Sequence, residues 1–519
     1  MKKKIWQRMG TAVLSVGMAI SLVACGEQKP PSGKETPEKT GETVTLTAPL
    51  PSAVSNDVPP LIEEHAAELT DFGLRLAWHS GANGNNTLLS PVSVATALGM
   101  TANGAAGKTL SEMETVLGMD RNTLNTVLCA YWRDLPECDQ AVLRPANSIW
   151  FTDQERFSVE QQFLKTCMAY YDAELFQAPM QDQTCRDINR WVKEKTEGMI
   201  PEILDQIPKD AVMYLINALS FEGEWMEPYE KQQVQEGVFL TNTGMPVKTD
   251  FLYSEEGSYL ENEAATGVMK LYQGGKYAFV GLLPKGDLTL MGLLDALDGE
   301  SLQEMLRNPS DESVRTMLPK FETTYDADMR EILTDMGMPQ AFDSHRADFS
   351  KLGTSVDGNI YINRVLHQTV LSLGEQGTRA GAATVVEIKD EAMPLETEKP
   401  KEVFLDRPFL YLLIDTDTCV PFFLGTMNDP TGAVPVSVAG SAPMAVQIDG
   451  ILYENTGKHG YMGGRCGTMD GRINSTVKAG EVPKKENQSN FGTGWEYQRI
   501  DDGIEMQFGR HWIVFEKAS

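Results

Sequence analysis

The sequence predicts a large domain of mixed α and β structure (α+β) followed by a small all-β domain. Helical patterns dominate the first half of the chain, and long apolar strand patterns then continue to about residue 430. From about residue 447 the chain changes to short alternating runs between Gly and Asn turns, which is typical of a small sheet. With 519 residues, 41% hydrophobic and 23% charged, the composition is that of a soluble globular protein.

Two segments carry the clearest helix signals. The first begins at Ser90-Pro91, where proline in the first turn marks a helix start. The second, residues 185–204, has Ile188, Trp191 and Val192 at helical spacing and is expected to stop at Gly198.

The strand signals are long apolar runs. Residues 211–225 form one such run, as expected for a strand that is covered on both faces. Residues 277–286 predict a second buried strand, and residues 409–425 predict a hairpin that turns between Asp415 and Thr418. We therefore expect a mixed domain at 58–430, a linker at 431–446 and an all-β domain at 447–519.

The N-terminal 25 residues are typical of an export signal. A basic start precedes an apolar stretch that is shorter than the roughly 20 residues of a membrane-spanning helix. Leu22-Val23-Ala24-Cys25 resembles a bacterial lipobox, which implies that Cys25 carries diacylglycerol and becomes the first residue of the mature chain. The alternative is a plain signal peptide with an unrelated cysteine.

Residues 26–57 are rich in Pro, Gly, Thr, Glu and Lys, which predicts a disordered tether. The expected protein is therefore secreted and lipid-anchored to the outer face of a bacterial cell membrane. The sequence does not identify the Gram type of the cell.

Composition excludes several classes of function. The net charge of −28, without clusters of Lys and Arg beyond the first residues, excludes nucleic acid as a partner. We find no G-x-S-x-G, H-E-x-x-H, phosphate-binding glycine loop or metal-ligand spacing, so we expect no enzyme, cofactor or metal site. The remaining cysteines have no C-x-x-C pair, which predicts mostly free or buried thiols, with the first two as possible neighbours. They are Cys129, Cys138, Cys167, Cys185, Cys419 and Cys466.

The stretch "EQGTRAGAATVV", residues 375–386, is built almost entirely of small side chains and precedes a charged segment. Because strand side chains alternate between faces, Thr378, Ala380, Ala382, Thr384 and Val386 would share one face. The other face would carry Arg379, Gly381, Ala383, Val385 and Glu387. A slip of one residue would bury Arg379, at a cost of several kcal/mol. This pattern fits a loop that can enter a sheet as a strand; the alternative is a flexible surface loop of low complexity.

Five segments in order along the chain resemble the serpin family. They are "NTLLSPVSVATALGMTANGAAGKTLSEM", "LINALSFEGEWMEPY" with Asn217 and Trp225 at motif positions, "LPKFETTYDADMREILTDMGMPQAFDSHRADFSKL", "VLHQTVLSLGEQGTRAGAATVV" and "VFLDRPFLYLLIDTDTCVPFFLGTMNDP". The resemblance covers nearly all of the large domain. It implies the serpin fold, with three β-sheets, about eight or nine helices and an exposed reactive-centre loop.

The resemblance also implies a function. A serine protease attacks the loop and forms an acyl-enzyme ester, and the cut loop then inserts into the main sheet and traps the protease. The hinge and insertion segment would comprise Glu375, Gly377, Thr378, Ala380, Gly381, Ala382, Ala383 and Thr384. The alternative is a non-inhibitory serpin that serves as a surface binding or structural protein. In either case we expect a monomer.

In the family the attacked bond lies about seventeen residues into this motif, which here is Glu391–Ala392. The segment from Ala392 to Asp406 is about six residues longer than is common, so the register stays open between Glu391 and Ala392. Glu391 implies a glutamyl-specific target, and Ala392 an elastase-like or subtilisin-like one. Lys389 would suit a trypsin-like enzyme but shortens the inserting strand, and Pro394 makes Met393 a poor site. The natural target is not identified.

A second group of residues matches the family's shutter, the cluster that keeps the middle of the sheet closed but able to open. These residues are Ser90, Ser93, Asn217 and His367. Hydroxyl, amide and imidazole groups can exchange hydrogen bonds as strands part. The simpler interpretation of each is a buried polar residue with its hydrogen bonds satisfied.

The C-terminal domain resembles no family that we can name. Trp495 and Tyr497 could bind cell-wall glycan if exposed, although core packing explains such aromatic residues more often. Its role stays open.

Overall fold

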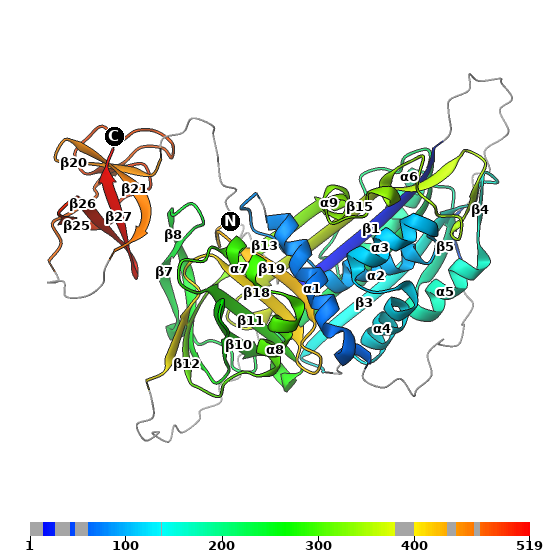
Figure 1. Cartoon of the computed structure of the whole chain (residues 1–519), viewed down its shortest axis with the longest axis horizontal. Helices are drawn as coiled ribbons and strands as arrows, with labels where there is room; N and C mark the ends of the chain where they lie inside the picture. The colour runs from blue at the N-terminus through cyan, green and yellow to red at the C-terminus, as the bar shows by residue number, and fades with distance from the viewer. Residues whose placement is uncertain are drawn as a thin grey trace, which may run out of the picture.

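The computed structural model describes residues 14–25, 42–46, 61–81, 83–135, 138–378, 399–432, 443–460 and 468–518 of the chain. Figure 1 shows a large body of helices and sheets, with a smaller sheet beside β7 and β8 at one end.

The large sheet runs through the centre of the body. Its order is β13-β15-β1-β6-β3-β5-β2, and β16 also pairs with β6. Because β1 is antiparallel to both β6 and β15, those two strands run in the same direction. The bounds are β13 Phe321–Asp328, β15 Asn359–Leu373, β1 Leu14–Cys25, β6 Ala211–Glu224, β3 Ala141–Thr152, β5 Glu174–Ala178, β2 Val44–Thr45 and β16 Gly377–Thr378.

Strand β6 confirms the prediction for residues 211–225. Its residues are buried from Ala211 to Phe221, because helices cover both faces of the sheet. On one face Ile188, Trp191 and Val192 of α6 pack against Tyr214 and Ile216. On the other face lies the main core, with α2 fully buried.

The described part of the chain contains nine α-helices. Helix α2 begins at the predicted Ser90, whose side chain accepts a hydrogen bond from the backbone N of Ser93. Helix α6 ends three residues before the predicted Gly198, which has a φ of +86°. The α-helices are α1 Leu61–Gly81, α2 Pro91–Ala102, α3 Gly107–Leu117, α4 Arg121–Arg133, α5 Gln161–Tyr171, α6 Asp182–Lys195, α7 Leu290–Ala296, α8 Gly299–Arg307 and α9 Arg330–Asp335. The 3₁₀ helices are η1 Lys231–Gln233, η2 Gln273–Gly275 and η3 Pro339–Phe342.

The large body contains two further sheets of four or more strands. One has the order β19-β18-β11-β10-β9 and contains the predicted strand at 277–286 and the predicted hairpin. Its strands are β9 Tyr259–Glu261, β10 Ala265–Leu271, β11 Tyr277–Pro284, β18 Phe409–Asp415 and β19 Pro421–Met427. The other has the order β17-β12-β8-β7. Its strands are β7 Val234–Leu240, β8 Pro246–Glu256, β12 Val314–Pro319 and β17 Lys401–Phe404.

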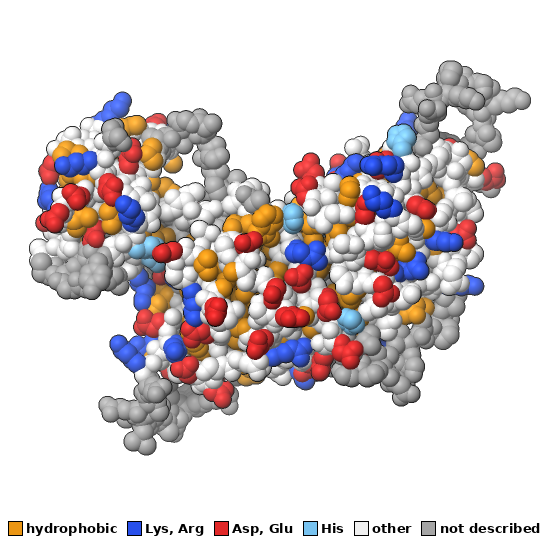
Figure 2. Space-filling model, viewed as in Figure 1, with side chains coloured by type: hydrophobic (Ala, Val, Ile, Leu, Met, Phe, Trp, Pro, Cys, Tyr) orange, Lys and Arg blue, Asp and Glu red, His pale blue; other side chains and the backbone are white. Residues whose placement is uncertain are grey.

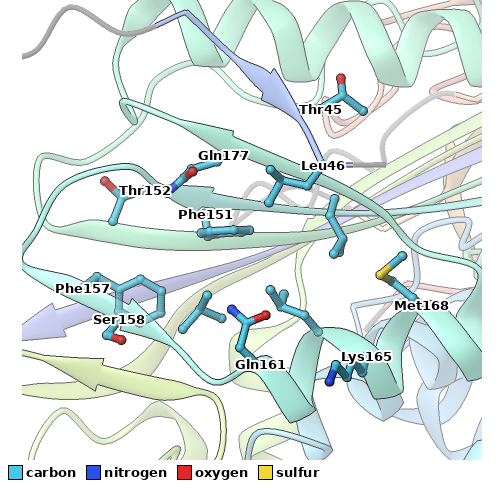
Figure 3. A pocket seen from close by; sticks show the side chains of 13 residues that line it. Thr45, Leu46, Phe151, Thr152, Phe157, Ser158, Gln161, Lys165, Met168 and Gln177 are labelled. Atoms are coloured by element: carbon cyan, nitrogen blue, oxygen red, sulfur yellow. The ribbon is translucent and has the colours of Figure 1, made fainter. Parts of the chain in front are cut away.

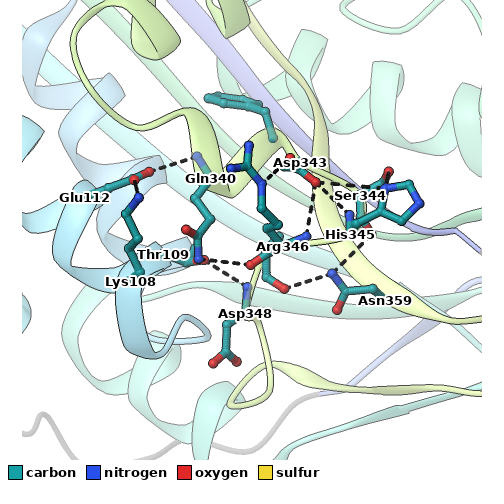
Figure 4. A network of polar contacts seen from close by, with 12 residues as sticks. Lys108, Thr109, Glu112, Gln340, Asp343, Ser344, His345, Arg346, Asp348 and Asn359 are labelled. Atoms are coloured by element: carbon teal, nitrogen blue, oxygen red, sulfur yellow. Dashed lines mark hydrogen bonds and ion pairs between the residues drawn. The ribbon is translucent and has the colours of Figure 1, made fainter.

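A polar network fixes the segment that leads into β15 (Figure 4). The backbone N of Gln340 donates to the carboxylate of Glu112 in α3 (2.8 Å), and the backbone N of Asp348 donates to the Thr109 hydroxyl (2.9 Å). Asn359, the first residue of β15, donates to the carbonyl of Ala347 (2.8 Å). Within this segment, β14 Gly353–Ser355 pairs with β4 Phe157–Val159 in a small two-stranded sheet.

The C-terminal domain is a separate sheet with its own core. Its order is β22-β25-β26-β27-β21-β20-β24-β23. Tyr497 is buried and Trp495 is partly buried against this core, so packing accounts for both aromatic residues. The strands are β20 Ala445–Ile448, β21 Ile451–His459, β22 Gly471–Arg472, β23 Ser475–Thr476, β24 Gln488–Ser489, β25 Glu496–Ile500, β26 Gly503–Phe508 and β27 His511–Lys517.

Parts of the predicted signal peptide and tether are strands here. Residues 14–25 form β1 in the middle of the large sheet, and Val44–Thr45 form β2 on its edge beside β5. An apolar run rich in Val, Ile and Leu is compatible with both a signal sequence and a buried strand. The mature chain that the lipobox predicts would begin at Cys25, the last residue of β1.

On the face shown in Figure 2, acidic and basic side chains are interspersed, and we see no continuous basic stripe. Among the described cysteines, Cys129, Cys138, Cys167, Cys185 and Cys419 are free thiols, as predicted, and Cys466 lies outside the described residues. In the part of the chain that the structure covers, no helix is both long enough and apolar enough to cross a membrane.

Candidate functional site

The chain turns back on itself where β15 ends. Trp225 holds this turn, because its indole N–H donates to the carbonyl of Gly374 and its backbone N–H to the carbonyl of Gln376, both at 2.9 Å. Gly374 and Gly377 face each other in an antiparallel bridge. The chain that leaves β15 therefore re-enters the sheet beside β6.

Gly377 is required by this turn. Its φ is +136°, and a Cβ at this position would lie 2.1 Å from the carbonyl oxygen of Gly223. Only glycine meets both conditions, because other residues rarely adopt this φ and all of them carry a Cβ.

Thr378 is anchored inside the sheet. Its side chain is fully buried, and its hydroxyl lies 2.6 Å from the hydroxyl of Tyr272. The Tyr272 ring stacks on Trp225, with 4.5 Å between ring centroids. The position therefore accepts a small hydroxyl side chain and has no space for a long charged one.

The outer side of the turn is held by an ion pair. Glu375 Oε1 lies 2.7 Å from Lys320 Nζ, and the two side chains are 36% and 31% exposed. The carbonyl of Glu375 also accepts a hydrogen bond from the backbone N of Tyr229 at 2.9 Å. Exposed pairs of this kind contribute at most about 1 kcal/mol, so the pair orients the turn more than it stabilises it.

The hinge and β1 lie on one line between β6 and β15. Gly377 is opposite Glu224 of β6 and Thr378 is opposite Gly223. Leu14, the first residue of β1, is opposite Phe221, so one residue of β6 separates the two pairings. Strand β1 thus fills a space one strand wide that starts where the hinge stops.

The side chains of β1 that are described show the two faces of this space. Ile20 and Leu22 are fully buried in the main core, on the side of α2. Ser21, which points to the other face, is 2% exposed and lies opposite Tyr214 and Arg364. The space therefore has one face that is closed by the core and one face that reaches a charged residue.

Asn217 and His367 flank the middle of the space. Both are opposite Met18, Asn217 on β6 and His367 on β15. Among the described residues, Asn217 Oδ1 and His367 Nδ1 have no hydrogen-bond partner, although both are buried. A buried polar atom without a partner costs about 1–3 kcal/mol, so closing the space would let these two groups satisfy each other.

The other two predicted shutter residues connect this pair to α2. The backbone N of Ser90 donates to His367 Nε2 at 3.3 Å, and the backbone N of Ser93 donates to the Ser90 hydroxyl at 3.3 Å. Asn217 donates to Asn147 Oδ1 at 2.7 Å. The four residues therefore do lie around the middle of the sheet, on the face that α2 covers.

The remaining predicted site residues are placed as follows. Cys25 lies at the far end of β1, opposite Asn359. Ala380, Gly381, Ala382, Ala383, Thr384, Glu391 and Ala392 lie outside the described residues. Tyr272 and Lys320 were not predicted, because they are 106 and 55 residues away from their partners and no local pattern links them.

A cavity of about 690 Å³ lies between β2, β3, β5 and α5 (Figure 3). Among the residues that line it, Lys165 is the only charged one. Within the described residues there is no group of His, Cys, Asp and Glu side chains that could hold a metal ion.

The fold agrees with what other proteins show. A family model described as Serpin (serine protease inhibitor) matches residues 67–430. This match spans more than half of the chain, so the protein belongs to the serpin family, whose members in general target serine proteases. The predicted fold class is thereby confirmed, including the additional C-terminal β domain.

Individual relatives cover most of the large body. A serpin-like protein of Thermococcus kodakarensis is 29% identical over 378 residues, covering 70% of this chain and 85% of its own. An alpha-1-antitrypsin-like protein of Tamias sibiricus is 27% identical over 384 residues, which cover 72% of this chain and 90% of that protein.

Among solved structures, the thermophilic serpin tengpin in its native state is 37% identical, with a TM-score of 0.66, and covers 75% of this chain and 100% of its own. Tengpin in its latent state is 39% identical, with a TM-score of 0.63, and covers 72% and 100%. Human thyroxine-binding globulin shares the fold at 22% identity and a TM-score of 0.62, covering 72% and 100%.

The buried imidazole makes the stability of the fold depend on pH. Burial lowers the pKa of His367 from 6.5 to about 3. Between these two values the unfolded chain binds a proton at His367 and the folded chain does not, so the free energy of unfolding decreases as the pH falls.

We therefore expect His367→Asn to lose part of this pH dependence. Between pH 7 and pH 5, His367 should account for about 2 kcal/mol of the decrease in the wild type, measured by urea unfolding at both pH values. His345→Asn is the matched control, because His345 has an 88% exposed side chain. An unchanged pH dependence in His367→Asn would contradict the assignment.

Proposed function

We propose that this serpin inhibits serine proteases by suicide-substrate loop insertion and covalent trapping. One observation carries the proposal: the hinge ends in line with a strand-wide space between β6 and β15, which accepts an antiparallel partner on both sides. In the mature chain that the lipobox predicts, residues 14–24 are absent, so the cut loop can take this space.

The hinge register fixes where each loop residue would go. Continued along β6 from Thr378 and Gly223, it brings Ala380 opposite Phe221 and Ile388 opposite Met213. These are the positions of Leu14 and Leu22 in β1. Loop and β1 would therefore use the same nine positions of the sheet.

The faces of the loop suit these positions. Thr378 is buried on the core side, so Ala380, Ala382, Thr384 and Val386 would follow it there. Thr384 would take the position of Met18, between Asn217 and His367. Its hydroxyl can donate and accept, so it suits the two buried atoms that have no partner in the described structure.

The charges of the loop also suit their neighbours. In the same register Arg379 would lie opposite Glu222 of β6, and Glu387 opposite Arg364 of β15. The Arg364 side chain is 38% exposed, so a glutamate opposite it can reach both the guanidinium and solvent. Opposite charges across a pair of strands contribute about 0.2–1 kcal/mol each.

The chemistry follows from this arrangement. The catalytic serine of the protease attacks the carbonyl of the bait residue, Glu391 or Ala392, and the bond to the following nitrogen breaks. The bait residue stays bound to the protease as an acyl ester, and the loop N-terminal to it is released to insert. Insertion displaces the protease to the far end of the sheet before water hydrolyses the ester.

The same proposal gives the protein a place at the cell surface. Cys25 would carry the lipid, and residues 26–43 would connect it to the large body. The target would then be a serine protease outside the cell, glutamyl-specific, elastase-like or subtilisin-like.

We expect the mature chain to form a complex with such a protease that survives boiling in detergent, measured on a denaturing gel. Thr378→Arg should lower the yield of complex at least about tenfold, because an arginine buried without a partner costs several kcal/mol. Thr354→Arg, an exposed strand threonine, is the matched control. Cleavage of the wild type without any complex would contradict inhibition and favour a non-inhibitory serpin.

The bait bond should be visible in the small C-terminal fragment that a protease releases. Its mass should correspond to a chain that starts at Ala392 when a glutamyl endopeptidase forms the complex, and to a chain that starts at Met393 when elastase forms it. A complex formed only by a trypsin-like enzyme, with a fragment that starts at Asp390, would reject both choices.

Reversing a charge should test the register of insertion. Arg364→Glu should lower the melting temperature of the loop-cleaved form by about 2–4 °C, because it faces Glu387 with a like charge. Adding Glu387→Arg should restore part of the loss in a double-mutant cycle, with the uncut forms as controls. If the effects of the two substitutions on the melting temperature of the cleaved form are strictly additive, the proposed pairing of Glu387 with Arg364 is wrong.

A further inference from the structure

The C-terminal domain contacts the strand that directly follows the loop. Arg510 lies between β26 and β27; its guanidinium carbon lies 3.6 Å from the ring centroid of Phe404, and its Nη2 lies 3.3 Å from Glu402 Oε2. Next to it, His511 Nε2 lies 3.1 Å from Asp406 Oδ2. Three alternate residues of one segment, Glu402, Phe404 and Asp406, therefore contact the turn of the β26–β27 hairpin.

The alternation along this segment divides its contacts between the two domains. Val403 and Leu405 are fully buried in the core of the large body. Glu402, Phe404 and Asp406 point the other way, where the hairpin presents Arg510 and His511. The hairpin thus places the guanidinium of Arg510 next to the Glu402 carboxylate and the imidazole of His511 next to the Asp406 carboxylate.

The hairpin itself is seated against β7. A Cβ at Gly509, which has a φ of +58°, would lie 3.1 Å from the Cβ of Val238, and Leu240 belongs to the core of the C-terminal domain. The backbone N of Leu240 donates to the carbonyl of Asp406 at 2.9 Å. Figure 1 shows the C-terminal sheet beside β7 and β8. The two domains therefore share apolar as well as polar contacts at this point.

Strand β17 needs such support. Among the described strands it is an edge strand whose only partner is β12, with which it pairs in parallel over four residues. Short edge strands are the parts of a sheet that open most easily. Added contacts on the second face raise the cost of detaching β17.

Detachment of β17 matters because it sets the length of the uncut loop. Twenty-two residues lie between Thr378 and Lys401. If nine of them filled the space between β6 and β15, the remaining twelve beyond Ile388 could span at most about 40 Å on the way back to β17. Figure 1 places β12, the partner of β17, at the opposite end of the molecule from the far end of β1. Releasing residues 401–405 would add about 17 Å to this return path.

We propose that the C-terminal domain fastens β17 through Arg510 and thereby keeps the uncut loop out of the sheet. The inference rests on the proposed function, and it gives the C-terminal domain a role in preserving the inhibitor before it meets a protease. The domain acts here as an intramolecular clamp and contributes no group to the attack on the loop.

The first test is amide hydrogen exchange in the full mature chain. In Arg510→Ala the amide hydrogens of residues 401–405 should exchange roughly fivefold faster than in the wild type. The exchange rates of β11 and β18 should not change. Arg499→Ala is the matched control, because Arg499 pairs with Asp449 within the same domain. Glu402→Gln removes the ion pair from the other side and should accelerate exchange without touching the C-terminal domain.

The second test is incubation without protease at a temperature below unfolding. Arg510→Ala should lose its trapping capacity at least about threefold faster than the wild type and become an uncut, heat-resistant form. Equal exchange at β17 in the wild type, Arg510→Ala and Glu402→Gln would overturn the clamp. If the wild type traps no protease, the proposed function fails, and the exchange measurement still decides whether the clamp exists.

Discussion

Only one strand fits between β6 and β15, and the large sheet depends on which segment of the chain takes that place. The two flanking strands run in the same direction, so an antiparallel partner between them satisfies the backbone groups of both. In this structure the partner is β1. Occupation by β1 and by the loop is mutually exclusive, because both would use the same pairings with β6 and β15. On the proposed mechanism, removal of the segment before Cys25 would therefore be required for inhibition, in addition to its proposed role in export.

The residues around this place are polar where a static core would be apolar. Asn217 and His367 lie on opposite sides of β1, each with one buried atom that has no partner among the described residues. A lasting arrangement would not leave two such atoms unsatisfied, since each costs free energy. We interpret them as groups that would change hydrogen-bond partners between two states of the sheet. In one state the two flanking strands would be adjacent, and in the other a threonine of the inserted loop would lie between them. The fully buried α2, whose N-cap residue Ser90 donates its backbone N–H to His367, would support the sheet in both states of the proposed mechanism.

Much of this arrangement could be predicted from the sequence. The apolar run at 211–225, the Ser90-Pro91 helix start and the small residues after Gly377 are local patterns with a direct physical reading. The fate of residues 14–25 could not be predicted, because a mostly apolar stretch of twelve residues suits an export signal and a buried strand equally well. The contacts of Tyr272 with Thr378 and of Arg510 with β17 could not be predicted either. They join residues more than a hundred positions apart, and nothing in the neighbourhood of either residue marks the partner.

The short strand β2 has a consequence for how the protein would stand on a membrane. Because Val44 and Thr45 are paired to β5, a lipid-anchored chain would have only residues 26–43 to bridge the gap to the bilayer, a connection of at most about 65 Å. This connecting segment joins the large sheet at one lateral edge, so that edge would be turned towards the lipid. Soluble enzymes would then contact the remaining surface of the molecule, and only within a short distance of the membrane.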